Sequence, residues 1–133
     1  MTDSICPNCG QAGVYSPPGP CDICAYSLSR TLFLLTEDGT KAREMNTTKH
    51  FDMHWSRTIF GEESKYWDRR NQYSIQPDGS SWFLLPNPSS QNQTLVNGGA
   101  ITGSYLLQEG DVISVGNEER ATEKTKLIVT FDL

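Results

Sequence analysis

Short apolar runs, each followed by a turn signal, recur along the chain after residue 28. The run at residues 31–36 ends at Asp38-Gly39, and the run at residues 94–96 ends at Asn97-Gly98. Gly, Asn, Asp and Pro favour tight turns, and apolar runs this short are typical of β-strands. No long segment carries the apolar face of an amphipathic helix. The pattern therefore predicts an all-β fold, either a sandwich or a barrel.

Three segments of this region allow more specific predictions. Phe51, Met53 and Trp55 alternate with polar residues, which predicts a half-buried strand. A second short strand is expected over residues 58–60. Residues 117–126 are rich in helix-forming residues but have no apolar face, which predicts a solvated loop or a single helical turn before the last strand.

The four cysteines lie near the N-terminus as two C-x-x-C pairs. Zinc in structural sites takes four soft ligands in a tetrahedron, and two turns that each present two thiolates supply them. The residues between the pairs are rich in Gly and Pro and poor in apolar side chains, so metal binding would provide the free energy of folding. Two disulfides or a redox dithiol are the alternatives. We predict a zinc ribbon or knuckle over residues 1–28 and a second unit over residues 29–133, with the zinc ligands Cys6, Cys9, Cys21 and Cys24.

Composition and the absence of certain motifs argue against several classes of function. The formal net charge is −5, and residues 1–27 contain no Lys or Arg, which disfavours nucleic-acid binding. No apolar stretch reaches the roughly 20 residues that a membrane helix needs. The N-terminal residues show no signal-peptide pattern, so we expect a cytoplasmic protein. No nucleophile arrangement or nucleotide-binding glycine loop is present, so we expect the chain not to be an enzyme.

Four segments resemble the forkhead-associated (FHA) family. Residues 90–98 and 107–116 are similar to its Ser-x-Asn-Gly-Thr-x-Val-Asn-Gly and Leu-x-x-Gly-Asp-x-Ile-x-Ile-Gly patterns. Residues 70–75 resemble its Arg-x-His-x-x-Ile segment, with Gln72 at the place of the histidine. Residues 58–61 look like the strand that enters its Gly-Arg signature, which puts Glu62 at the place of the arginine. The resemblance covers about residues 30–133 and implies an FHA-like β-sandwich of about eleven strands.

The resemblance also implies a function, because loops of the FHA sandwich bind phosphothreonine peptides. Cationic side chains hold the phosphate, and side-chain amides hold the peptide backbone. The Asn92 amide would either reach the ligand backbone or brace the loops. Arg70 would either contact the ligand or be structural. The residues expected to bind a phosphopeptide are Lys65, Arg69, Arg70, Gln91 and Asn92.

The sequence thus predicts a phosphopeptide-binding adaptor with a structural zinc site. Its partner would be a phosphorylated protein or peptide, such as a Ser/Thr kinase or its substrate. Because a carboxylate repels phosphate, Glu62 favours a second hypothesis, a degenerate FHA module that binds proteins independently of phosphorylation. A nucleic-acid-associated zinc ribbon and a thiol redox catalyst are further alternatives.

Overall fold

The structure is a computed structural model that describes residues 4–5, 12–15, 31–79 and 81–131. Near the N-terminus, β1 (Ser4–Ile5) and β2 (Ala12–Tyr15) pair in an antiparallel manner. The four cysteines and the predicted boundary at residue 28 lie outside the described residues. The zinc element therefore stays a prediction.

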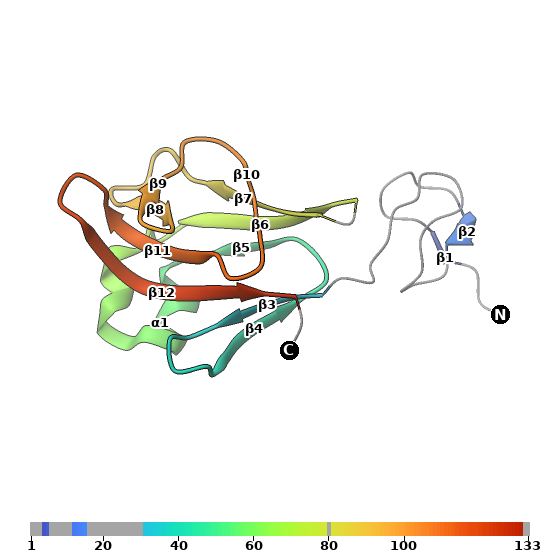
Figure 1. Ribbon diagram of the computed structural model, residues 1–133, viewed down its shortest axis with the longest axis horizontal. Helices are drawn as coiled ribbons and strands as arrows, with labels where there is room; N and C mark the ends of the chain where they lie inside the picture. Colours follow the sequence, from blue (N-terminus) through green and yellow to red (C-terminus); the bar gives the residue numbers. More distant parts are fainter. Residues whose placement is uncertain (1–3, 6–11, 16–30, 80, 132–133) are drawn as a thin grey trace.

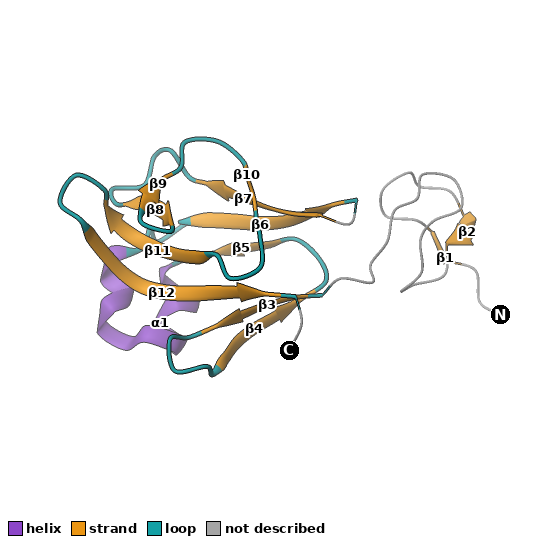
Figure 2. Cartoon of the chain, viewed as in Figure 1, coloured by secondary structure: helices purple, strands orange, loops and turns teal. Residues whose placement is uncertain are grey.

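Two antiparallel sheets make up most of the remaining described chain (Figures 1 and 2). The larger sheet has six strands in the order β4-β3-β12-β11-β8-β9, and the smaller has four in the order β10-β7-β6-β5. The predicted sandwich is confirmed, with ten strands in its two sheets rather than about eleven. The strands of the larger sheet are β3 (Leu32–Leu35), β4 (Lys41–Met45), β8 (Gln93–Val96), β9 (Gly99–Ala100), β11 (Val112–Asn117) and β12 (Thr122–Thr130). Those of the smaller sheet are β5 (Lys49–Phe51), β6 (Tyr73–Asp78), β7 (Ser81–Pro86) and β10 (Tyr105–Leu106).

The hydrophobic core contains alternate residues of both sheets. In β3, Leu32 and Leu34 are fully buried while their neighbours are half-exposed. Side chains on alternate positions of a strand point to opposite faces, so one face of each strand supplies the core. Fully buried residues of other strands complete the core, among them Ile75, Leu84, Ile113, Leu127 and Val129.

A helical segment replaces the strands that were predicted over residues 51–60. Phe51 ends β5, and α1 (Met53–Phe60) follows, so the prediction of strands in this segment is wrong beyond Phe51. Asp52 caps the helix, because its carboxylate accepts a hydrogen bond from the backbone N–H of Trp55 at 2.8 Å. Gly61 ends it with φ of 61°, a conformation that glycine adopts without strain. A 3₁₀ helix, η1 (Gly61–Tyr66), continues the segment.

The last strand begins earlier than predicted. Residues 122–126 belong to β12 instead of a loop or helical turn, and only residues 118–121 form the turn. Cross-strand pairing holds this part of β12, since Gly116 lies opposite Glu123 and Asn117 opposite Thr122. A helix-period pattern could not reveal this strand, because its pairing with β11 outweighs the intrinsic preference of its residues. None of the helices in the described part of the chain has the length and apolar character needed to cross a bilayer.

Candidate functional site

One end of the sandwich carries a hollow of about 720 Å³ between the segment that follows η1 and the loop that joins β7 to β8. All five residues that the sequence analysis assigned to ligand binding line it. We call it the cationic hollow, because three of them are Lys or Arg. Its lining residues are Met53, Lys65, Tyr66, Trp67, Asp68, Arg69, Arg70, Asn87, Ser89, Gln91 and Asn92.

Trp67 fixes the first wall of the cationic hollow to the core. Its side chain is 2% exposed, and its indole N–H donates to Oγ1 of Thr125 in β12 at 2.9 Å. Its ring packs against those of Trp55 and Tyr73, at centroid distances of 5.8 and 5.1 Å. A buried indole with a satisfied N–H is a rigid anchor. Trp67 therefore holds the loop in place and is not an exposed contact residue.

Asp68 shapes the turn that presents the two arginines. Its carboxylate accepts hydrogen bonds from the backbone N–H groups of Arg70 at 2.8 Å and Asn71 at 3.1 Å. Such a side-chain-to-backbone pattern stabilises a tight turn. The side chains of Arg69 and Arg70 are exposed, and within the described residues neither forms a salt bridge. The turn thus offers two guanidinium groups to an incoming anion.

Gln72 joins the two walls of the cationic hollow from beneath. Its side chain is fully buried, and its Oε1 accepts from the backbone N–H of Asp68 at 2.9 Å. Its Nε2 donates to the backbone carbonyl of Asn92 and to Oγ1 of Thr94, both at 3.1 Å. The sequence analysis placed Gln72 at the family's histidine position but did not include it in the site. Its role depends on contacts across twenty positions of the chain, so only the family comparison could have pointed to it.

The second wall is braced by two asparagines. Nδ2 of Asn87 donates to the carbonyl of Asn71 at 2.7 Å, and its Oδ1 accepts from the N–H of Ser89 at 3.0 Å. Nδ2 of Asn92 donates to the carbonyl of Tyr66 at 2.9 Å. Of the two roles expected for the Asn92 amide, its nitrogen performs the bracing one. Gln91 is exposed, and within the described residues its side chain forms no such brace.

Glu62 does not line the cationic hollow. It is exposed in η1 and lines a separate hollow with Arg57 and Lys65, not the cationic hollow. The segment that precedes it is helical, so the comparison of residues 58–61 with the strand of the Gly-Arg signature is wrong. The helix forms because Asp52 caps it and its apolar residues pack on the core. The inference that Glu62 replaces a phosphate-binding arginine therefore has no structural basis.

Comparisons with known proteins agree with this fold. The family model of the FHA domain matches residues 69–116. A solved structure described as "Structural and functional analysis of phosphothreonine-dependent FHA domain interactions" is 21% identical, with a TM-score of 0.54 over 77% of this chain and 98% of that one. The FHA domain of an Arabidopsis thaliana hypothetical protein is 20% identical, with a TM-score of 0.59 over 90% and 94% of the two chains.

A third similar structure is the FhaA FHA domain complexed with the intracellular domain of Rv3910. It is 22% identical, with a TM-score of 0.51 over 74% of this chain and 98% of that chain. No curated protein matches the chain. The sandwich described above therefore has the FHA fold. The family match begins at Arg69 and includes the lining residues of the cationic hollow from Arg69 to Asn92.

Proposed function

We propose that this chain is a non-catalytic adaptor that binds a phosphothreonine peptide in the cationic hollow. The observation that carries the proposal is the convergence of Lys65, Arg69 and Arg70 on one hollow at the loop end of the sandwich. The only carboxylate that lines this hollow is Asp68, and its oxygen already accepts two backbone N–H groups. An excess of positive charge at this place is unexpected in a chain of net charge −5.

The chemistry of the lining suits a phosphorylated peptide. A guanidinium group donates two parallel hydrogen bonds to phosphate oxygens, and an ammonium group adds a point charge. Arg69 and Arg70 would provide the first kind of contact and Lys65 the second. Gln91, which is exposed on the opposite wall, would bind the peptide backbone through its amide. Asn92 would keep the walls at a fixed separation, because its Nδ2 is bonded to Tyr66.

The similar structures support this proposal in general terms. One concerns phosphothreonine-dependent interactions of FHA domains, and another is a complex with an intracellular protein domain. We infer that the partner of this chain is a phosphorylated protein, such as a Ser/Thr kinase or its substrate. We also propose that the chain acts in the cytoplasm, where such phosphorylation occurs.

The test is a binding assay with paired peptide libraries. The full chain is titrated with a degenerate library that has phosphothreonine at its centre and with the same library carrying threonine. We expect binding only to the phosphorylated library. Replacing Arg69 with alanine should weaken it about tenfold or more, because hydrogen bonds to charged groups contribute about 1.5–3 kcal/mol each.

Arg43→Ala is the matched control. Arg43 is exposed in β4 and lines neither the cationic hollow nor the hollow of Glu62 and Arg57, so its loss changes the net charge equally but should leave binding intact. Equal affinity for the two libraries would contradict the proposal. It would support a module that binds proteins independently of phosphorylation.

We further propose that Cys6, Cys9, Cys21 and Cys24 bind one zinc ion that stabilises the N-terminal element. The support is the paired C-x-x-C spacing, which suits a tetrahedral thiolate site. Elemental analysis of the purified chain should find one zinc per molecule, and a Cys21→Ser/Cys24→Ser variant should lose it. Metal-free protein with two disulfides by mass spectrometry would contradict this proposal.

A further inference from the structure

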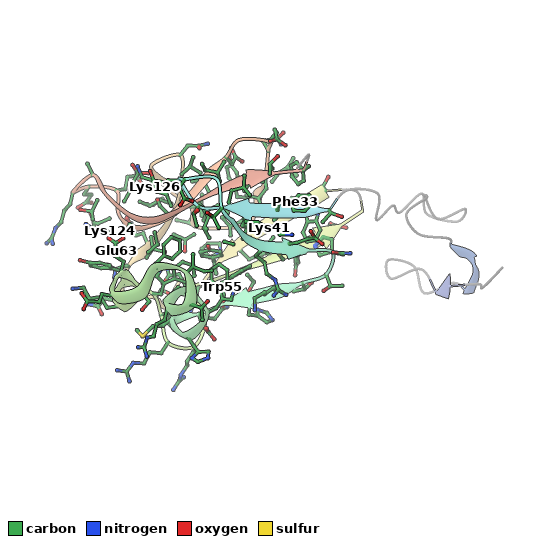
Figure 3. The ribbon with its side chains drawn as sticks, turned by 90° about the horizontal axis from the view of Figure 1, so that it is seen from below. Phe33, Lys41, Trp55, Glu63, Lys124 and Lys126 are labelled. Carbon is green, nitrogen blue, oxygen red and sulfur yellow. The ribbon has the colours of Figure 1, made fainter. Side chains whose placement is uncertain are left out.

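The helical segment between β5 and β6 carries cations of its own beside the cationic hollow. A second hollow of about 260 Å³ is lined by Met53, His54, Arg57 and Arg69. Figure 3 shows the segment beside the sheets with Trp55 on its inner side, where this residue packs against the core. His54 and Arg57 are exposed, so they lie on the part of α1 that the sandwich does not cover.

This second hollow adjoins the cationic hollow. Met53 and Arg69 line both of them. A third hollow, of about 640 Å³, is lined by Arg57 together with Lys65 and Glu62, and Lys65 also lines the cationic hollow. Arg57 therefore lines one hollow with Arg69 and another with Lys65, and both of these residues also line the proposed phosphate site.

The charges along this surface are mainly positive. Arg57, Lys65, Arg69 and Arg70 face two carboxylates, those of Glu62 and Asp68, and no carboxylate lines the hollow between Arg57 and Arg69. The lone salt bridge found in the described residues joins Lys41 to Glu44 in β4, so none of these four cations is neutralised in that way. Like charges that share neighbouring hollows repel one another over distances below the Debye length, about 8–10 Å. Binding of an anion would relieve this repulsion.

We propose that Arg57 and His54 form a second anion subsite, which binds another negative group of the peptide whose phosphothreonine occupies the cationic hollow. The proposal rests on the function proposed above. The negative group is either the carboxylate of Asp or Glu or a second phosphate. Because Arg69 lines both hollows, the second anion lies within a few residues of the phosphothreonine, at about 3.3–3.6 Å of extended chain per residue.

The subsite belongs to this chain's own helical segment. Trp55 and Phe60 bind α1 to the core, and the Asp52 cap fixes where the helix starts. Arg57 is in the last turn of the helix, and its carbonyl accepts from the N–H of Gly61. The backbone of Arg57 is thus held in place while its side chain remains exposed and free to reach a ligand.

The experiment uses an array of phosphothreonine peptides bound to the full chain. Each position from five residues before to five after the phosphothreonine is fixed in turn as Asp, Glu, phosphothreonine, Ala or Lys. We expect selection of Asp, Glu or a second phosphothreonine at one or two adjacent positions, and rejection of Lys there. The Asp and Glu arms identify a carboxylate as the preferred group, and the doubly phosphorylated arm identifies phosphate.

Arg57→Ala should remove this selection while leaving the dependence on phosphothreonine unchanged. We expect affinity for the selected peptide to fall about fivefold if its second anion is a carboxylate, as for exposed ion pairs, and further if it is a phosphate. Affinity for the peptide with Ala at that position should not change. Arg43→Ala, the control with an equal change of charge, should retain the selection. Thermal unfolding of both variants verifies that they are folded.

The outcomes separate the two proposals. Phosphothreonine-dependent binding without acidic selection, or with a selection that Arg57→Ala does not alter, would overturn the second subsite and leave the proposed function standing. Absence of phosphothreonine-dependent binding in wild type would overturn both proposals.

Discussion

Replacing Gln72 with leucine should loosen the cationic hollow and destabilise the fold. Leucine has a similar volume but no polar atoms, so the core stays filled while three hydrogen bonds are lost. These are the bonds of the Gln72 side chain with the N–H of Asp68, the carbonyl of Asn92 and Oγ1 of Thr94. The two walls of the hollow would then lose the brace that Gln72 provides and keep the bonds made by Asn87 and Asn92.

The expected decrease in the free energy of unfolding depends on how exposed the three hydrogen-bond partners are. Asp68 and Asn92 are half-exposed, so water can reach their backbone groups and each lost bond costs about 0.5–1.5 kcal/mol. Thr94 is only 3% exposed and keeps one longer bond, from Oγ1 to the carbonyl of Gln72 at 3.4 Å. The loss of its bond with Gln72 Nε2 therefore costs a free energy at the upper end of the same range, about 1.5 kcal/mol. We expect the free energy of unfolding to fall by about 2.5–4.5 kcal/mol in total.

The assay is urea unfolding followed by tryptophan fluorescence, with phosphopeptide affinity measured in parallel. Small domains have m-values of about 1–3 kcal/mol per M, so the midpoint should fall by about 1–2 M. Gln76→Leu is the matched control, because Gln76 lies in β6, four residues after Gln72, is half-exposed and makes no side-chain hydrogen bond among the described residues. A Gln72→Leu midpoint within error of the Gln76→Leu midpoint would refute the role assigned to Gln72.

Two further predictions concern stability. The Tyr73 hydroxyl is buried and has no hydrogen-bond partner in the described part of the chain, so Tyr73→Phe should raise the free energy of unfolding by about 1 kcal/mol in urea titration. Burial also raises the pKa of Tyr73. Above about pH 10 the tyrosine of the unfolded chain would therefore lose its proton before that of the folded chain, and the free energy of unfolding would fall. The Tyr73→Phe variant should partly avoid this fall. A free energy of unfolding lower than that of wild type at neutral pH would contradict the stabilisation expected for Tyr73→Phe. A Cβ at Gly116 would lie 1.9 Å from the carbonyl oxygen of Thr122, so Gly116→Ala should cost about 3 kcal/mol or prevent folding. Gly103→Ala, whose Cβ meets nothing within 4 Å, should change thermal stability little, and equal melting temperatures of the two glycine variants would contradict this reasoning.

The candidate site was predicted from the sequence in part. Lys65, Arg69, Arg70, Gln91 and Asn92 were chosen through the family resemblance, and the structure brings all five to one hollow. Which of them brace the loops could not be predicted, because an Asn side chain can bond to a ligand or to its own protein with equal ease.

Two elements show why local patterns were insufficient. The alternation of Phe51, Met53 and Trp55 fits a strand, but Trp55 also shares one face of a helix with Ile59, four residues later. The Asp52 cap and the packing of Trp55 on Phe51, at 4.7 Å between ring centroids, favour the helix. The early residues of β12 form a strand only because β11 lies beside them.

The turn residues and the alternation of side chains by themselves determined the all-β class of the fold, since they act over a few positions of the chain, and the resemblance to the FHA family indicated the sandwich. The tertiary structure alone decided that the loop of Asp68 meets the loop of Asn92. That contact joins residues more than twenty positions apart, and it depends on the pairing of β6 with β7 and on the buried amide of Gln72. Local preferences specify which residues turn or extend, but only the register of the paired strands specifies which loops become neighbours.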